Sequence, residues 1–351
     1  MTDATAPDGD RASRRRRRWR IALLSALIAV VVLTTAVTLG GWLYGRSLDH
    51  NVKRTDVFAG LPDNRPRDVV QGAMNVLLMG TDSRDPAGGG NARSDTLMLL
   101  HLTADHDHAY VISIPRDTWV SVPPLTGANG GGGSDPAGGT MAKINAAYAW
   151  GGAPLAVRTV EKYTGVRIDH VVLIDFAGFQ QVVDALGGID MQVDQTITSR
   201  FPPHRVFTAG THHVTGAEAL DYVRQRYQYP DGDFTRERHQ QEFLKDLMDR
   251  AANQGWLTDP VKLNGFLQAV TRSVTVDSGF DLVGAGLQMR GLRASDLTFL
   301  TSPSTGTTWI GDQNVVMPDT ARAASLYRAV ADDSVAQWLA VNPTPSLIPG
   351  D

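Results

Sequence analysis

The chain of 351 residues contains no cysteine. This absence excludes disulfides, thiolate zinc sites and a cysteine nucleophile. Lysine is also scarce, because only five of the 33 basic residues are lysines and the others are arginines. Chemistry that depends on charge must therefore rest on carboxylates, hard metal ions and arginine.

Several catalytic motifs are missing as well. The Gly88–Gly90 run is not followed by the lysine of a phosphate-binding P-loop. No Gly-x-Ser-x-Gly elbow of a serine hydrolase is present. His101, His106 and His108 do not have the spacing of metal ligands on a helix, so we expect them in loops or at the surface. These absences make nucleotide hydrolysis and serine catalysis poor explanations of the chain.

An apolar run of 24 residues without formal charge covers positions 21–44. About 20 apolar residues span a hydrocarbon core, so this run predicts a transmembrane helix. The alternative is a cleaved signal peptide, for which the small residues at 36–41 offer a cleavage site. Residues 1–20 hold seven Arg against three Asp, and basic flanks stay in the cytoplasm. We therefore expect a cytoplasmic tail over 1–20 and a body outside the membrane.

The remaining chain divides into a stalk, one large domain and a tail. Residues 45–70 are polar and contain two prolines, which is typical of a linker. We expect a folded domain over 71–335 and a C-terminal tail over 336–351. The total charge is −4 and the first 20 residues carry +4, so the rest carries −8. A mildly acidic body argues against nucleic acid as a partner.

Short apolar runs alternate with helical patterns through the body. Strands are predicted at residues 76–79, 95–102, 109–115, 171–174 and 189–193. Helices are predicted at residues 143–150, 155–164, 176–186, 215–227, 235–252 and 320–330. This alternation predicts an α/β domain. The connection from 102 to 109 is too short for a helical crossover, so the sheet must be mixed.

Two carboxylates flank a Gly-rich loop between predicted strands. Asp82 and Arg84 follow the first strand, while Arg93 precedes Asp95 at the start of the second. Ligand sites of α/β domains collect at strand ends, and Mg²⁺ combines carboxylate oxygens with substrate phosphates. Asp82 and Asp95 are therefore candidate ligands of a divalent cation. The alternative is that Asp82 caps a turn and Asp95 pairs with an arginine.

Arginines form two further clusters. Arg116 comes directly after the strand at 109–115. Arg224 and Arg226 end the helix at 215–227, and Arg236 and Gln240 share a helix face because they are four residues apart. The planar guanidinium can bind two phosphate oxygens at once. Together these side chains predict a phosphate site, although any one of them could instead be a solvated surface residue.

These clusters lie in segments that resemble the LytR-CpsA-Psr family of bacterial envelope proteins. The matching segments are Asn75 to Arg84, Arg93 to Thr96, Ser113 to Asp117, Lys143 to Gly152, Ile174 to Ile189 and Ala219 to Gln241, with weaker similarity over 301–327. The resemblance implies a three-layer α/β/α sandwich with a mixed central sheet, preceded by one transmembrane helix. It also implies a phosphotransferase that moves a glycopolymer from a polyprenyl-pyrophosphate carrier to peptidoglycan and forms a phosphodiester.

The resemblance assigns roles to residues by matching positions. Asp82 and Asp95 would hold Mg²⁺, or alternatively Mn²⁺, and either could be the general base. The pyrophosphate would be bound by Arg84, Arg93, Arg116, Arg224, Arg226, Arg236 and Gln240. Catalysis would rest on Asp82, Asp95, Arg116, Arg224 and Arg226. A tunnel for the lipid chain would be lined by Leu173, Phe176, Phe179, Val182 and Leu186, whose alternative role is ordinary core. The sequence departs from many relatives at His239, where they carry Arg.

Two other functions stay open at this point. Water could replace the acceptor at the same site, which would make the chain a polyprenyl-pyrophosphate hydrolase. A non-catalytic, lipid-binding envelope regulator is the second alternative. The bias towards Arg, Ala and Gly indicates an actinobacterial source. Arabinogalactan is therefore the leading candidate for the glycopolymer, ahead of other wall polysaccharides and teichoic-type polymers.

Overall fold

The computed structural model describes residues 52–81, 94–124, 139–229, 232–253 and 260–342. The expected cytoplasmic tail and transmembrane helix lie outside these ranges. Within them, none of the helices combines the length and the apolar character that crossing a membrane requires.

A seven-stranded sheet forms the centre of the domain in the order β1-β12-β7-β2-β3-β4-β13. The strands are β1 (Lys53–Thr55), β12 (Val274–Asp277), β7 (His170–Asp175), β2 (Met74–Thr81), β3 (Ser94–Leu102), β4 (Ala109–Ser113) and β13 (Leu297–Thr301). The pairs β1/β12, β2/β7 and β4/β13 are parallel, and the other three pairs are antiparallel. The predicted mixed sheet is therefore confirmed.

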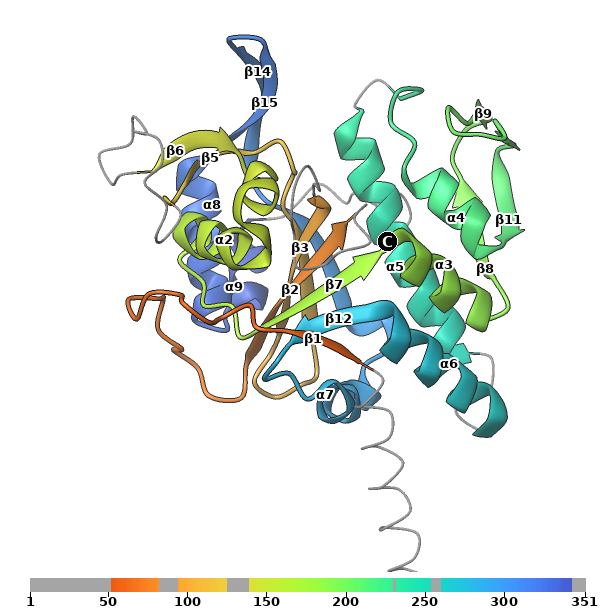
Figure 1. Ribbon diagram of the computed structural model, residues 1–351, viewed down its shortest axis with the longest axis horizontal. Coiled ribbons are helices and arrows are strands. Elements are labelled where there is room, and N and C mark those ends of the chain that lie inside the picture. Colours follow the sequence, from red (N-terminus) through yellow and green to blue (C-terminus); the bar gives the residue numbers. More distant parts are fainter. Residues whose placement is uncertain (1–51, 82–93, 125–138, 230–231, 254–259, 343–351) are drawn as a thin grey trace, which may run out of the picture. The chain divides into compact units, whose positions relative to one another are not determined.

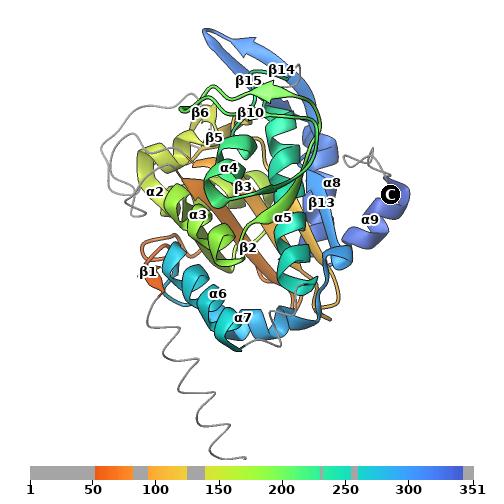
Figure 2. The same cartoon turned by 90° about the vertical axis from the view of Figure 1, so that its right-hand side faces the viewer.

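Helices cover both faces of this sheet (Figures 1 and 2). One face carries α2 (Ala146–Thr164), α8 (Thr320–Ala331) and α9 (Val335–Val341). The other face carries α3 (Phe176–Ala185), α4 (Gly216–Val223), α5 (Asp233–Asn253) and α6 (Pro260–Ser273). A short helix, α7 (Leu282–Gln288), follows β12.

Strand alternation decides which side chains face which helix layer, because successive residues point to opposite faces. Leu77, Leu99 and Ile112 are fully buried in the core beneath α2 and α8. Burying a side chain of this size contributes about 1.5–3 kcal/mol to stability. Leu78 and Met98 alternate with them and line a pocket on the opposite face. One face of the sheet is thus a packed core, while the other leaves room for a ligand.

Four small antiparallel pairs surround the sheet in the described residues. They are β5 (Trp119–Val122) with β6 (Thr140–Lys143), β8 (Ile189–Val193) with β11 (Gly210–Val214), β9 (Ile197–Thr198) with β10 (Val206–Phe207), and β14 (Ser304–Ile310) with β15 (Gln313–Pro318). The strand predicted at 189–193 therefore exists, but it pairs outside the central sheet.

Helix α2 is broken near its start. Gly151 and Gly152 have non-helical backbone angles, and the φ of Gly152 is +61°, a region that glycine reaches easily. Pro154 follows, and proline is tolerated in the first turn of a helix. The two helices predicted at 143–150 and 155–164 are therefore two parts of one kinked element. Residues 143–145 are an exception, because Lys143 ends β6 and the helix begins at Ala146.

The structure differs from four other expectations. His101, which we expected in a loop or at the surface, is buried in β3 and contacts Asn75 and Asp333. Part of the expected stalk, Lys53–Thr55, is β1, because its backbone pairs with Thr275 to Asp277. Part of the expected tail is α9, whose Val335 and Trp338 are buried against α8. The helix predicted at 215–227 ends at Val223.

Candidate functional site

A pocket of about 480 Å³ opens between the central sheet and the layer of α3, α4 and α5. We call it the arginine pocket, because it is lined by four arginines that come from three different segments. These are Arg116 after β4, Arg224 and Arg226 after α4, and Arg236 on α5, and Gln240 joins them. The structure therefore brings together five of the residues that the sequence predicts at a phosphate site.

A tight turn after β4 holds Arg116. Thr118 donates to the carbonyl of Pro115 from its backbone nitrogen at 2.9 Å and from its hydroxyl at 2.6 Å. The carbonyl of Arg116 accepts from the backbone nitrogen of Asn145 at 3.1 Å. Beside it, Asp117 lies 3.2 Å from Lys143 Nζ. The backbone of this turn is thus fixed on both sides, and the Arg116 side chain is directed into the pocket.

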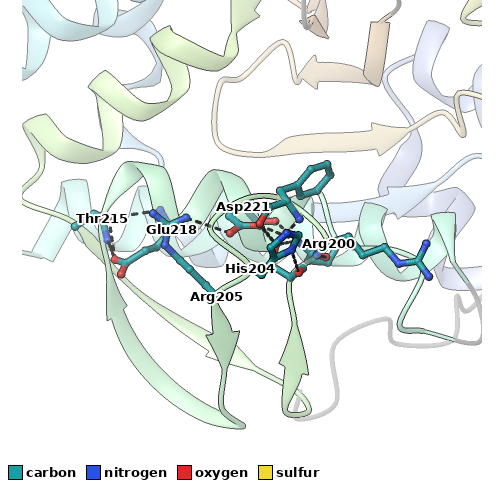
Figure 3. A network of polar contacts seen from close by, with 9 residues as sticks. Arg200, His204, Arg205, Thr215, Glu218 and Asp221 are labelled. Atoms are coloured by element: carbon teal, nitrogen blue, oxygen red, sulfur yellow. Dashed lines mark hydrogen bonds and ion pairs between the residues drawn. The ribbon is translucent and has the colours of Figure 1, made fainter.

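The buried side chain of Gln225 holds the segment after α4 that carries Arg224 and Arg226. Its side chain is buried and donates to the Asp221 carboxylate at 2.7 Å and to the Ser199 hydroxyl at 2.8 Å. Asp221 also accepts from Arg205 at 3.2 Å, so α4 is bound to the loop that precedes β10 (Figure 3). Helix α4 ends at Val223, two residues before Gln225. With Gln225 held inward, its two neighbours Arg224 and Arg226 both line the pocket.

On α5, neighbouring glutamines have different surroundings. Gln240 lines the arginine pocket with Arg236, one turn earlier. Gln241 is buried and donates to the Ser113 hydroxyl at 2.8 Å and to the Leu300 carbonyl at 3.1 Å. Ser113 ends β4 and Leu300 lies in β13, so Gln241 joins the helix to two strand ends. This contact positions the pocket-facing side of α5.

A second polar network joins the exposed carboxylate of Asp194 to the buried side chains of Tyr222, Tyr229 and His239. Asp194, in the loop after β8, accepts from Tyr229 at 2.9 Å and from Tyr222 at 3.1 Å, and lies 3.2 Å from His239 Nε2. Burial lowers the pKa of His239, although Asp194 opposes this effect. Burial alone would raise the pKa of Asp194, but hydrogen bonds from Tyr229 and the other partners leave it below its usual value.

His239, where the resemblance leads us to expect Arg, belongs to this network. The imidazole lies inside it and does not line the arginine pocket. Arg238 contacts Asp194 at 2.9 Å and lines a separate pocket of about 240 Å³.

Most of the other residues that line the arginine pocket are apolar. Phe176, Phe179 and Val182 of α3 line it, as the resemblance implies for a lipid tunnel. The rings of Phe179 and Phe243 are stacked with centroids 4.4 Å apart. Such offset ring pairs add stability beyond the area that they bury. A ligand in this pocket would therefore meet cations at one part and hydrocarbon at another.

Two residues expected in the tunnel lie elsewhere. Leu173 is packed in the core beneath α2, whereas its neighbours Val172 and Ile174 line the pocket. The reason is strand alternation, which turns residue 173 to the opposite face of β7. Leu186 is buried at the end of α3 and is not part of the pocket lining.

The structure describes only part of the candidate metal site. Asp82, Arg84 and Arg93 lie outside the described residues, and for Asp95 the structure gives the backbone within β3. Thr81 pairs with Ser94 at the ends of β2 and β3. Gly80 and Thr96, next to these positions, line the arginine pocket. The described ends of β2 and β3, from which the chain continues to Asp82 and in which Asp95 lies, are therefore beside the pocket.

Asp175, Phe201 and Tyr227 are among the pocket-lining residues that the sequence did not predict. Asp175 caps α3 by accepting from the Gly178 nitrogen at 2.6 Å, and it lines the pocket. Its position directly before a predicted helix is the usual signal of such a cap. Phe201 and Tyr227 also line the pocket. No local pattern reveals them, because they come from irregular segments.

The chain matches the LytR_cpsA_psr family over residues 48–331. It is 33% identical over 274 residues to the polyisoprenyl-teichoic acid–peptidoglycan teichoic acid transferase TagU of Bacillus cereus, covering 75% of this chain and 81% of that relative. It is 29% identical over 313 residues to the cell wall biosynthesis protein LcpA of Corynebacterium glutamicum, covering 77% of this chain but 57% of LcpA. The crystal structure of B. subtilis TagV aligns with a TM-score of 0.61 at 28% identity, covering 76% of this chain and 99% of TagV.

The sequence match and the fold point to the same group of proteins. The family match includes every segment that contributes a residue to the arginine pocket. The chain therefore belongs to the LytR_cpsA_psr family.

Proposed function

We propose that the chain is a phosphotransferase that moves a glycopolymer from a polyprenyl-pyrophosphate carrier to peptidoglycan. One observation carries the proposal, namely a single pocket whose lining combines an arginine cluster with many apolar side chains. A polyprenyl pyrophosphate has the same division, with a charged head and a hydrocarbon chain. The name of the TagU relative supports the class of reaction.

The arginines suit the head group of this donor. Arg116, Arg224, Arg226 and Arg236 reach the pocket from segments that are fixed by backbone and buried side-chain contacts. Preorganised cations of this kind stabilise the charge that develops on phosphate oxygens in the transition state. The apolar lining from Phe176, Phe179 and their neighbours would hold the first part of the lipid chain.

The reaction breaks one phosphorus–oxygen bond and forms another. A hydroxyl of the acceptor attacks the phosphorus that carries the glycan, and the bond from this phosphorus to the bridging oxygen breaks. Polyprenyl phosphate leaves with the bonding electrons, and a phosphodiester joins glycan to acceptor. The hydroxyl proton passes to a carboxylate, for which Asp82 and Asp95 are the candidates. The pyrophosphate itself supplies the free energy, so no nucleotide is required.

Asp82 and Asp95 would also hold Mg²⁺, or Mn²⁺. Two carboxylates beside a phosphate site form the oxygen donor set that these hard cations favour. The pairing of Thr81 with Ser94 supports the assignment, because Asp82 follows Thr81 in the sequence and Asp95 follows Ser94. When bound, such a cation neutralises charge on the phosphate oxygens.

The remaining parts of the proposal concern location and substrate. An N-terminal transmembrane helix over 21–44 would leave the N-terminus in the cytoplasm and hold the domain outside, close to its membrane lipid substrate. The composition favours arabinogalactan as the glycopolymer, and other wall polysaccharides or teichoic-type polymers are the alternatives. No role for nucleic acid is part of the proposal.

The experiment combines the purified full chain with a synthetic lipid-linked glycan, Mg²⁺ and peptidoglycan fragments. We expect release of polyprenyl phosphate together with glycan joined to peptidoglycan. Free glycan phosphate alone would identify a hydrolase. No release with either Mg²⁺ or Mn²⁺ would favour the non-catalytic lipid-binding regulator.

A further inference from the structure

The β14–β15 hairpin extends away from the central sheet and its helices in both views (Figures 1 and 2). Its strands pair from Ser304 with Pro318 to Ile310 with Gln313. Gly311 begins the two-residue turn with a φ of +61°, as tight hairpin turns require at this position. The hairpin is therefore an arm with a defined register from Gly306 to Met317, beyond a shift in pairing between Ser304 and Gly306.

A large aromatic side chain lies near the tip of this arm. Trp309 is 68% exposed, whereas most large apolar side chains of the described residues are buried. Asn314 is its direct cross-strand partner, and Thr307 lies two residues away on the same face of β14. Both of these polar side chains are exposed. The face thus offers one indole ring beside an amide and a hydroxyl.

The charge of the arm limits what can bind this face. Over residues 304–318 the only ionisable side chain is Asp312. A nucleic acid or an anionic membrane would be attracted by Lys and Arg, which this segment does not contain. A neutral glycan fits better, because the C–H face of a sugar ring packs on indole while its hydroxyl and amide groups pair with Asn and Thr. Tryptophan is also the residue type that most often dominates binding energy at interfaces.

The base of the arm is attached to the turn that holds Arg116. The Val316 nitrogen donates to the Asp117 carbonyl at 2.9 Å, and Thr118 pairs with Val316 in a parallel bridge. Arg116, directly before Asp117, lines the arginine pocket. The arm and the pocket therefore share one rigid turn, and a polymer bound to the arm would be held in a fixed relation to the reacting phosphate.

We propose that the Thr307–Trp309–Asn314 face of the β14–β15 hairpin binds the neutral glycan strand of the acceptor. This inference rests on the proposed function, in which peptidoglycan accepts the polymer. It adds a surface that acts on the acceptor alone, separate from the arginines and the apolar lining that act on the donor.

The test measures binding of the detergent-solubilised full chain to purified peptidoglycan sacculi by co-sedimentation, without donor. We expect Trp309→Ala to weaken binding about tenfold. Trp309→Tyr retains a ring and should keep most of the affinity. Val341→Ala on α9, which alters a side chain that is 78% exposed, is the matched control and should bind as the wild type does.

Transfer assays at varied acceptor concentration form the second readout. We expect Trp309→Ala to raise KM for the acceptor about tenfold. Equal sacculus binding by wild type and Trp309→Ala overturns the proposal, and so does a wild type that does not bind sacculi. If Trp309→Ala weakens binding to neutral lipid vesicles as much as binding to sacculi, Trp309 contacts a membrane. That result would also overturn the proposal. If Trp309-dependent binding is observed while the wild type transfers nothing, the glycan surface stands and the proposed function fails.

Discussion

The guanidinium carbon of Arg224 lies 4.3 Å from the centre of the Phe176 ring, where the charged part of the arginine pocket meets its apolar part. A second ring, that of Phe201, lies 4.2 Å from the same carbon. Planar guanidinium groups stack well on aromatic faces and keep their edges available for hydrogen bonds. Arg224 is thus held between two rings with its direction fixed before a substrate arrives.

This stacking predicts that lysine cannot replace Arg224. Lysine keeps the positive charge but has neither the planar group nor the paired donors. We expect Arg224→Lys to lower kcat/KM for the lipid-linked donor about 10- to 100-fold with an unchanged melting temperature. Arg200→Lys is the control, because Arg200 stacks on Tyr227 at 4.7 Å but does not line the pocket. Similar activity in the two variants would contradict the role of Arg224.

Gln240 and Gln241 should respond differently to the same substitution. Gln241→Ala removes two buried hydrogen bonds to Ser113 and Leu300 and should cost about 1–3 kcal/mol of stability. Gln240→Ala should reduce turnover without this loss, since Gln240 faces the pocket. Thermal unfolding and turnover, measured on both variants, separate the two roles. If both lose the same stability, the division between a supporting and a substrate-facing glutamine is wrong.

Neighbouring residues of β7 provide a test of the apolar lining. Leu173→Ala should destabilise the fold by about 2–5 kcal/mol, because Leu173 is in the core beneath α2. Ile174→Phe should narrow the pocket and slow turnover of a long-chain polyprenyl donor more than that of a short-chain donor. Comparing the two chain lengths checks this. An equal effect on both donors would show that the lipid does not reach Ile174.

Asp246 on α5 makes stability depend on pH. Burial, assisted by the charge of Asp249, raises the pKa of Asp246 from 3.8 to about 7. The folded state therefore holds a proton that the unfolded state releases, so this group lowers stability as pH rises from about 4 to 7. We expect Asp246→Asn to be more stable than the wild type at pH 8 by about 1–2 kcal/mol, with the gain shrinking toward pH 4. Chemical denaturation at several pH values measures the difference in stability between the two proteins. A gain in stability that does not depend on pH would contradict the raised pKa of Asp246.

The sequence predicted the parts of this site that local patterns encode. Arg236 and Gln240 share a helix face by spacing alone, and Arg116 follows a strand that apolar residues mark clearly. The sheet was correctly expected to be mixed, because the connection between β3 and β4 is too short for a helix.

Other parts depend on tertiary contacts that no local pattern reports. Side chains alternate between the two faces of β7, and packing in the folded domain decides which face meets the pocket. Ile174 therefore lines the pocket, whereas Leu173 lies in the core. Gln225, which lies between the pocket-lining Arg224 and Arg226, contacts Ser199, 26 residues away. The parallel pairing of β1 with β12 joins segments more than 200 residues apart, so residues 53–55 had no local signal of a strand.

The central claim is that the arginine cluster and the two carboxylates transfer a phosphoryl-linked glycan to peptidoglycan. The most direct measurement is Mg²⁺-dependent formation of glycan-linked peptidoglycan by purified full-length protein, compared with Asp82→Ala and Arg116→Ala. We predict transfer by the wild type and loss of transfer in both variants, each of which keeps the wild-type circular dichroism spectrum. Full transfer by either folded variant would contradict the site, and no transfer by the wild type would contradict the function.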